Sequence, residues 1–419
     1  MLRYVYTFLL CLSIPFVLCR LYWKGRRLPA YRRRIHERFG LGKIAPTDVW
    51  LHAVSLGEVV AATPLIDAFL AHKLRVFVTT MTPTGSLQVT TRFGDKVLHQ
   101  YIPYDLSWVL TRFFKKMNAR VGIIMETELW PNLIHQASLA NVPLVLANAR
   151  ISDMAFKHYE MMRFFFQPVL TKFTAILAQS ELDATRFVEL GAPVNRVHAL
   201  GNMKFDLQIQ VSNQAIFDQL KTAWGASRPV VMAASTHEGE EEQLLTGLTR
   251  LKAAIPNVIL LIAPRHPERF KTVHALAQQH GFSTQIRSLP DAIDAYTDVV
   301  ILDSLGELLG FFQVSDYAFV GGSLVPVGGH NVLEPIAMQV PVFCGPFMMN
   351  SKAICKALCD AGAMQCVENT DDLLARLIAM HSNPASRFCQ IESASGVLKA
   401  NQGAVLKSLE IILACIERK

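Results

Sequence analysis

The sequence lacks several patterns that would assign its chemistry directly. It has eight cysteines, but none forms a CxxC pair and no histidine stands at a zinc-finger spacing. We therefore expect reduced, mostly buried thiols in a protein body that lies in the cytosol. Neither GxGxxG nor GxxxxGK(S/T) is present, which argues against hydride transfer and P-loop chemistry. Short-period repeats and low-complexity tracts are also missing.

Charged residues are few, at 18% of the 419 residues, whereas hydrophobic residues make up 51%. This composition, with a mean hydropathy of +0.27, suggests contact with a membrane. The net charge of +7 favours an anionic partner. The length allows two or three domains.

The N-terminus combines an apolar run with a basic stretch. Residues 4–19 carry no charge, and residues 20–43 are rich in arginine and lysine, with Glu37 as their one acid. The apolar run is shorter than the ~20 residues of a comfortable bilayer span, although residues 21–23 can extend it. No A-x-A-like cleavage site follows, which argues against a signal peptide. We predict a membrane anchor over residues 1–23, spanning or interfacial, with the body on the cytoplasmic side. Nucleic-acid binding is a weaker alternative, because no such motif accompanies the basic stretch.

Strand-like and helix-like patterns then alternate along the chain, which predicts an α/β fold with parallel sheets. The polar stretch near residues 206–228 interrupts this alternation of strands and helices. It predicts a linker between a first domain, residues 24–205, and a second domain, residues 229–419. We expect two Rossmann-like domains facing a cleft, with helices at the C-terminus. The expected strands are 49–54, 75–80, 97–103, 121–126, 142–149, 173–180, 230–235, 258–264, 298–303, 315–322 and 340–345.

HAVSLGE (52–58) lies where a strand passes into a helix. Ser55 and Glu58 fit a capping box, in which the serine accepts from the N–H of residue 58 and the glutamate reaches back to the N–H of Ser55. The same turn stands at the carboxyl end of a strand, where α/β folds bind ligands. Both interpretations remain open from this stretch alone.

Two further segments supply charged groups in the first domain. METELWP (125–131) carries Glu126 and Glu128 after another strand, either as ordinary helix-start acids or as partners of Glu58. If Glu58 and Glu128 face each other, repulsion raises the pKa of one, which then becomes a better general base. Lys204, in GNMKFD, is either a solvated charge or a group that neutralises a phosphate or a carboxylate.

The second domain offers basic residues and glycine-rich turns at strand ends. Ser235 and Thr236 are possible helix caps, and EGEEE after His237 indicates an acidic first turn more simply than a metal site. Arg265 and His266 follow a strand, where arginine suits phosphate or carboxylate. VGGSLVPVGGHNVLEP (320–335) places glycines before a helix start, where Glu334 can accept from ribose hydroxyls.

MAFKHYEMMRFFFQPVL (154–170) has a helical pattern of aromatic and methionine side chains among basic residues. It indicates either a core helix or an exposed amphipathic face that docks on lipid.

Taken together, HAVSLGE, TPTG (82–85), METELWPN, NARIS (148–152), GNMKFD, APRHPERF and GGHNVLEP resemble, in this order, the 3-deoxy-D-manno-oct-2-ulosonic acid (Kdo) transferases of Gram-negative bacteria. The resemblance implies a GT-B enzyme on the cytoplasmic face of the inner membrane. Such an enzyme moves Kdo from CMP-Kdo to a lipid A precursor with inversion, and needs no metal or other cofactor.

The resemblance also implies roles for single residues. Glu58 would be the general base, and Glu128 and Lys204 would stabilise the transition state. CMP would contact Pro264, Arg265, Gly306, Glu307, Leu308, Asn331, Val332, Leu333 and Glu334.

Two alternatives remain. Another GT-B envelope glycosyltransferase would use a UDP-sugar and would be stabilised by UDP instead of CMP. A membrane-anchored nucleotide-binding scaffold would keep its function when Glu58 is changed to Gln.

Overall fold

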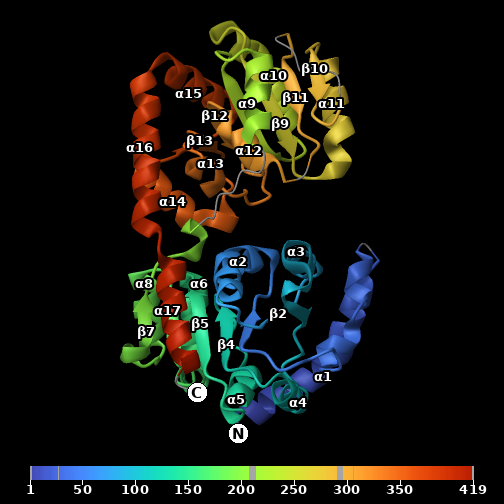
Figure 1. Cartoon of the computed structure of the whole chain (residues 1–419), viewed down its shortest axis with the longest axis vertical. Coiled ribbons are helices and arrows are strands. Elements are labelled where there is room, and N and C mark those ends of the chain that lie inside the picture. Colours follow the sequence, from blue (N-terminus) through green and yellow to red (C-terminus); the bar gives the residue numbers. More distant parts are fainter. Residues whose placement is uncertain (1, 27, 207–213, 290–295, 305, 418–419) are drawn as a thin grey trace. The chain divides into compact units, whose positions relative to one another are not determined.

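The computed structural model describes residues 2–26, 28–206, 214–289, 296–304 and 306–417. They form two compact units (Figure 1). The first contains residues 1–206 and 401–419, and the second contains residues 207–400. Each unit is built on one seven-stranded sheet whose paired strands all run parallel. The predicted α/β class with two Rossmann-like domains is therefore confirmed, and the cleft between them stays a prediction.

The first sheet has the order β3-β2-β1-β4-β5-β6-β7. Its five inner strands are fully buried, which explains why they appear in the sequence as largely apolar runs. The chain moves outward from β1 through β3 and then returns to β4 on the other side of β1, which creates a topological switch point. The strands are β1 (Val49–His52), β2 (Val76–Thr80), β3 (Leu98–Tyr101), β4 (Val121–Met125), β5 (Leu144–Ala149), β6 (Ala175–Ala178) and β7 (Val197–Ala199).

Helices cover both faces of this sheet. The apolar cluster on one face includes side chains from α2 (Leu56–Ala71), α3 (Pro83–Phe93) and α17 (Ala404–Glu417). The cluster on the other face takes its helical side chains from α4 (Ser107–Met117), α5 (Pro131–Leu139), α7 (Arg163–Leu170) and α8 (Glu181–Glu189), while α6 (Asp153–Met161) packs at its margin.

The second sheet has the order β10-β11-β9-β8-β12-β13-β14, with its own switch point between β8 and β12. The short strands β10 and β14 were not predicted, because they are only partly buried and lack the apolar run that marks β11 and β13. The strands are β8 (Val230–Thr236), β9 (Ile259–Pro264), β10 (Thr284–Ile286), β11 (Val299–Ile301), β12 (Tyr317–Val320), β13 (Val342–Cys344) and β14 (Gln365–Cys366).

The second sheet is also covered on both faces. One apolar cluster includes α10 (Glu240–Ala254), α11 (Phe270–Gln279) and α15 (Thr370–Ser382), and the other includes α9 (Gln214–Trp224) and α12 (Leu308–Gln313). The remaining helices of this unit are α13 (Leu333–Ala337), α14 (Lys352–Asp360) and α16 (Pro384–Asn401).

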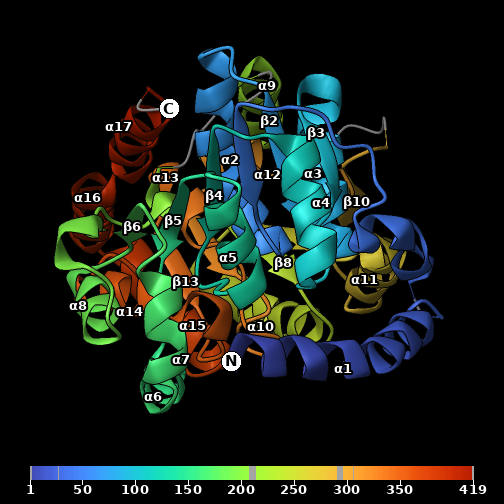
Figure 2. The ribbon, with the colours of Figure 1, turned by 90° about the horizontal axis from the view of Figure 1, so that it is seen from below.

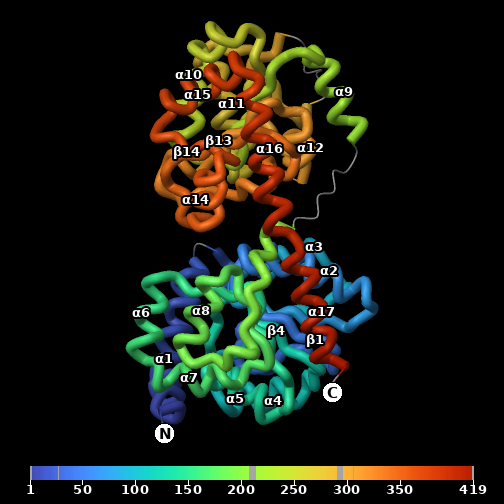
Figure 3. The backbone as a smooth tube through the Cα atoms, turned by 90° about the vertical axis from the view of Figure 1, so that its left-hand side faces the viewer, coloured from blue at the N-terminus to red at the C-terminus, as the bar shows by residue number. Residues whose placement is uncertain are grey.

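The predicted domain boundaries need two corrections. Part of the predicted linker is the helix α9, whose Phe217 and Trp224 are buried on the second sheet; residues 207–213 lie outside the described part of the chain. The final residues, expected in the second domain, return to the first unit as α17, which lies along α2 (Figure 3).

The return of α17 has a clear physical cause. Leu409, Ile412 and Ile416 complete the apolar cluster beside α2. The carboxylate of Asp206 also accepts hydrogen bonds from the N–H groups of Gly403 and Val405, at 2.6 Å each, and so anchors the start of the helix.

The N-terminal helix α1 (Leu2–Lys24) is long and apolar enough to cross a membrane, judged by length and composition. One side of it packs on the first unit, where Leu10, Ile14 and Val17 contact the cluster of Tyr104, Leu106 and Val109. The opposite side is exposed, with the residues Tyr4, Phe8 and Phe16 more than 60% accessible. Figure 2 shows α1 and the α6–α7 pair along the same side of the first unit.

The 154–170 segment is partly packed on the core and partly exposed, while its docking on lipid stays a prediction. It forms two helices, α6 and α7, and not one. Phe156, Tyr159 and Phe166 pack against the core, whereas an outer set is exposed: Met154, Met161, Met162 and Phe164.

Candidate functional site

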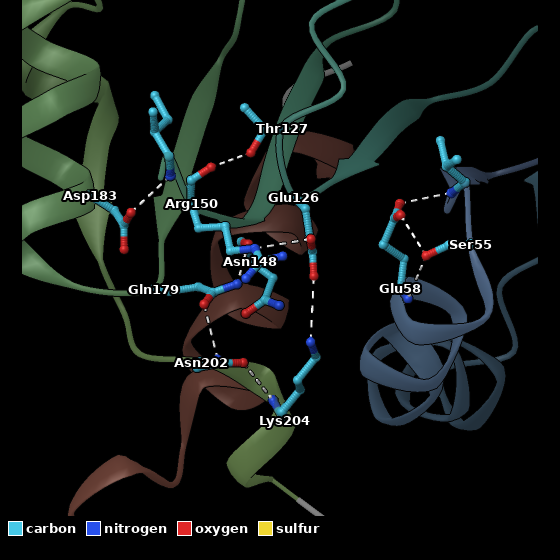
Figure 4. A network of polar contacts seen from close by, with 12 residues as sticks. Ser55, Glu58, Glu126, Thr127, Asn148, Arg150, Gln179, Asp183, Asn202 and Lys204 are labelled. Atoms are coloured by element: carbon cyan, nitrogen blue, oxygen red, sulfur yellow. Dashed lines mark hydrogen bonds and ion pairs between the residues drawn. The ribbon is translucent and has the colours of Figure 1, made fainter. Parts of the chain in front are cut away.

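Glu58 lies in the turn that joins β1 to α2, at the switch point of the first sheet (Figure 4). Ser55 is the N-cap of α2, and its hydroxyl accepts from the N–H of Glu58 at 3.4 Å, as predicted. The glutamate differs from the expected capping box, because its Oε2 accepts from the N–H of Val54, at 2.8 Å. The Ser55 hydroxyl donates to Oε1, at 2.8 Å. The cap therefore holds both oxygens of the carboxylate in place.

The environment of Glu58 favours its neutral form. Its side chain is buried, with 7% of the residue accessible. Burial is the largest cause that raises its pKa, to about 7, against the lowering effect of the bonds from Val54 and Ser55. The negative charges of Glu126 and Glu128 raise it further. Repulsion between acids was the expected cause of such a shift, but desolvation is the larger one.

Glu126 and Glu128 follow β4, the strand next to β1. Glu126 has a left-handed backbone with φ of 55°, a conformation that costs energy for a residue with a side chain. The carboxylate of Glu128 accepts from the indole N–H of Trp130 at 2.7 Å, and burial raises its pKa.

Lys204 is held by Glu126 (Figure 4). Its ammonium lies 3.6 Å from Oε1 of Glu126, and the guanidinium of Arg150 lies 3.2 Å from Oε2. Glu126 is only 15% accessible at its side chain, so this carboxylate bridges two cations in a partly shielded place. The structure thus brings Glu58, Glu128 and Lys204 to one edge of the sheet, with Glu126 as the connecting group.

Amide side chains fix the backbone around Lys204. Asn148 accepts from the N–H of Met203 at 3.0 Å, and Asn202 accepts from the N–H of Lys204 at 3.0 Å. Gln179 joins the two, because it donates to the carbonyl of Asn148 and accepts from Asn202. Sequence reasoning did not assign Asn148, Arg150, Gln179 or Asn202 to the site, although three of them lie in the NARIS and GNMKFD stretches.

The second unit has its own group of polar residues at the ends of β8 and β9. Pro264 closes β9, and the N–H of Arg265 donates to the carbonyl of Thr236 at 2.9 Å, which leaves the arginine side chain exposed. Ser235 and Thr236 belong to β8, so they are not the caps of α10. The N-cap is Gly239, and the acidic residues after it form the first turn of α10, as expected.

Two further predicted segments form local contacts. Asn331 donates to Glu334 at 3.0 Å and accepts from the N–H of Leu333 at 3.1 Å, while Val332 and Leu333 are buried. Burial raises the pKa of Glu334.

The second segment precedes α12. Gly306 has φ of 87°. The carboxylate of Glu307 lies 3.1 Å from the guanidinium of Arg287 and accepts a hydrogen bond from the hydroxyl of Ser304. Leu308 is the first residue of the helix.

Within the described ranges, no group of three or more histidine, cysteine, aspartate or glutamate side chains is arranged to hold a metal ion. The eight cysteines are free thiols.

Solved structures share the architecture of this chain. A glycosyltransferase from Rickettsia africae matches with a TM-score of 0.57 over 89% of this chain and 100% of that chain, at 13% identity. A putative UDP-N-acetylglucosamine 2-epimerase from Listeria monocytogenes matches with a TM-score of 0.55 over 89% of this chain and 96% of that chain, also at 13% identity. At this identity the likeness shows the fold alone, an α/β fold of the GT-B type.

Sequence relatives are more specific. A family model described as 3-deoxy-D-manno-octulosonic-acid transferase (kdotransferase) matches residues 33–207. A 3-deoxy-D-manno-octulosonic acid transferase of Haemophilus influenzae is 39% identical, over 100% of both chains. The enzyme of the same name from Bordetella pertussis is 32% identical over 98% of both chains. Identity of this extent over the whole length shows that the chain is a glycosyltransferase and belongs to the Kdo transferase family.

Proposed function

We propose that this enzyme transfers Kdo from CMP-Kdo to a hydroxyl of a lipid A precursor, lipid IVA, in lipopolysaccharide core biosynthesis, with inversion at the anomeric carbon. The observation that carries the proposal is the buried Glu58 carboxylate at the sheet's switch point, with a pKa of about 7. Near neutral pH a large fraction of such a group is the ionised carboxylate, and this carboxylate accepts a proton readily. Membership of the Kdo transferase family supports the choice of sugar.

In the proposed reaction Glu58 takes the proton from the acceptor hydroxyl as its oxygen attacks the anomeric carbon. The bond from that carbon to the phosphate oxygen breaks, and its electron pair leaves with CMP. One displacement of this kind inverts the configuration. The hydrogen bonds from Val54 and Ser55 keep the carboxylate in one orientation, which lowers the entropic cost of the step.

Lys204 and Glu128 are proposed to stabilise the transition state. The ammonium of Lys204 compensates the negative charge of the sugar acid or of the departing phosphate. Arg150 stands beside it on the same Glu126 carboxylate and extends the positive surface.

CMP is proposed to bind the second unit through Pro264, Arg265, residues 306–308 and residues 331–334. CMP leaves with a single phosphate, which arginine and backbone N–H groups can stabilise, so we propose that no metal is required. The alternative donor, a UDP-sugar, is distinguished by thermal shift: CMP should stabilise the protein more than UDP at equal concentration.

The body of the protein is proposed to lie on the cytoplasmic side of the bacterial inner membrane, with α1 lying along the membrane surface. The inner side of α1 is occupied by contacts with the first unit, among them the hydrogen bond from Asn132 to Thr7, at 2.9 Å. Phe165 of α7 lies 6.1 Å, ring to ring, from Tyr6. The exposed side of α1 and the outer side chains of α6 and α7 therefore supply one apolar surface with basic residues beside it, which suits an anionic lipid layer.

The deciding experiment is a transfer assay with the full chain in membranes. CMP-Kdo and a lipid A precursor are supplied, and the lipid products are weighed by mass spectrometry. We expect the wild type to add Kdo and Glu58→Gln to lose about 10²- to 10⁴-fold in rate while still binding CMP. Glu181→Gln, an exposed first-turn acid of α8, is the matched control and should transfer normally. Near-normal transfer by Glu58→Gln would reduce Glu58 to a helix cap.

A further inference from the structure

Two histidines of the second unit lie in direct contact. His237 follows β8, and His330 ends the glycine-rich loop after β12. Their Nε2 atoms are 2.8 Å apart, and their rings are nearly parallel, at 4°. His266, which follows β9, lies edge-on to His237 with ring centroids 5.2 Å apart. The segments that follow β8, β9 and β12 thus bring three imidazoles together near Arg265.

The contact between the two rings restricts their protons. At 2.8 Å one Nε2 must carry a hydrogen and the other must accept it. A hydrogen on both Nε2 atoms would set two donors against each other, so a proton added to the pair must go to an Nδ1 atom. Burial lowers the pKa of His330 to about 4, assisted by Arg265, His237 and His266. Burial also lowers the pKa of His237. Glu240 opposes this effect, whereas His266, Arg265 and Arg269 add to it. The pair as the structure shows it is therefore neutral near pH 7.

A buried carboxylate, Glu240, fixes the backbone of the two segments that carry His237 and His330. Glu240 is fully buried and accepts from the N–H groups of His237, Gly322, Ser323 and Leu324, at 2.7–3.0 Å. These bonds tie the turn after β8 to the loop after β12. A Cβ at Gly322, where φ is 65°, would lie 3.0 Å from the His330 ring, so glycine leaves room for the pair.

The histidine pair suits an anion whose negative charge increases during the reaction. The neutral imidazoles offer ring N–H groups next to an exposed arginine, and a bound dianion would raise their pKa. We propose that His237 and His330 bind the phosphate of the nucleotide donor and gain one proton when that phosphate leaves with the nucleotide. This inference rests on the proposed function, because it takes the donor to be a sugar nucleotide with a single phosphate.

The charges balance as follows. In the donor, the phosphodiester carries one negative charge. When the bond to the anomeric carbon breaks, the electron pair stays on the phosphate oxygen, and the product is a phosphomonoester whose second pKa is near 6. The proton of the acceptor hydroxyl goes to Glu58. The histidine pair takes its proton from solvent. Its positive charge then compensates the second negative charge of the phosphomonoester.

Calorimetry on the full chain in detergent tests this assignment. CMP and cytidine, which lacks the phosphate, are titrated near pH 6 and pH 8 in two buffers of different ionisation enthalpy. We expect the wild type to bind CMP more tightly at the lower pH, with proton uptake. His330→Gln should bind CMP about tenfold or more weakly, lose that uptake and bind cytidine as before. His280→Gln, at the exposed end of α11, is the control and should behave as wild type.

The outcomes are separable from those of the proposed function. Unchanged CMP affinity and proton uptake in both His330→Gln and His237→Gln would overturn the inference while leaving the donor intact. An equal loss for cytidine and CMP would assign the pair a purely structural role and would also overturn it. A wild type that binds UDP but not CMP would refute the proposed donor, and the inference with it.

Discussion

At the scale of single residues, the protonation of Glu58 depends on two opposed effects. Burial raises its pKa, while the hydrogen bonds from Val54 and Ser55 stabilise the charged form. A carboxylate in water would be a weak base, and one buried without these bonds would stay protonated. The cap and the proposed catalytic role are therefore compatible, because the same bonds that begin α2 keep the carboxylate oriented and partly ionised.

The pKa of Glu58 predicts the pH dependence of transfer. The proposed base must be deprotonated to act, so kcat/KM should rise with pH and level off above the Glu58 pKa of about 7. Initial rates between about pH 5.5 and pH 8.5 measure this limb, with CMP affinity followed in parallel to separate binding from chemistry. A rate that is flat across this range, with chemistry limiting, would contradict the role of Glu58.

Glu126 predicts a second effect at the same scale, as a positioning residue. Its charge raises the pKa of Glu58 and holds Lys204 and Arg150. Glu126→Gln should therefore move the acid limb of kcat/KM to lower pH and reduce the rate by on the order of 10- to 100-fold through misplaced cations. The matched control is again Glu181→Gln. A lower rate with an unmoved acid limb would leave Glu126 with only a structural role.

At the scale of elements, α17 completes the first unit although it comes last in the chain. Ile412 is fully buried between this helix and the sheet, whereas Leu406 on the same helix is 61% exposed. The periodicity of residues 404–417 predicts a helix with one apolar face, but it contains no information on which sheet that face covers.

Truncation of one side chain tests the packing of α17. Ile412→Ala should lower the free energy of unfolding of the first unit by about 2–5 kcal/mol, because it leaves a cavity in the core. Leu406→Ala should change it by less than about 0.5 kcal/mol. Urea denaturation followed by circular dichroism measures both. Equal, small effects would show that α17 does not pack on the first unit in solution.

At the scale of the whole molecule, the exposed face of α1 is the strongest sign of the protein's surroundings. Phe8 and Phe16 are 64% and 73% exposed, on a helix whose other side is occupied. Large aromatic rings in such a position are unfavourable in water and favourable at a lipid interface.

Vesicle binding tests this surface. The double change Phe8→Asp with Phe16→Asp should weaken binding to anionic vesicles by about tenfold or more, since it removes apolar burial and adds negative charge. Leu182→Asp, an exposed position on α8, serves as the control. Flotation of the full chain on a density gradient measures the bound fraction. If the double variant floats as well as the wild type, α1 does not attach the protein through this face.

The sequence by itself determined the α/β class, most strands, the capped turn at Glu58 and the apolar N-terminal helix, because each depends on neighbours within a few residues. Only the tertiary structure decided that Lys204 is held by Glu126, that His237 contacts His330, and that α17 belongs to the first unit. These residues are far apart in the chain, and strand order, which local patterns do not encode, brings them together. The raised pKa of Glu58 has the same origin, since its burial is a property of the assembled sheet and helices.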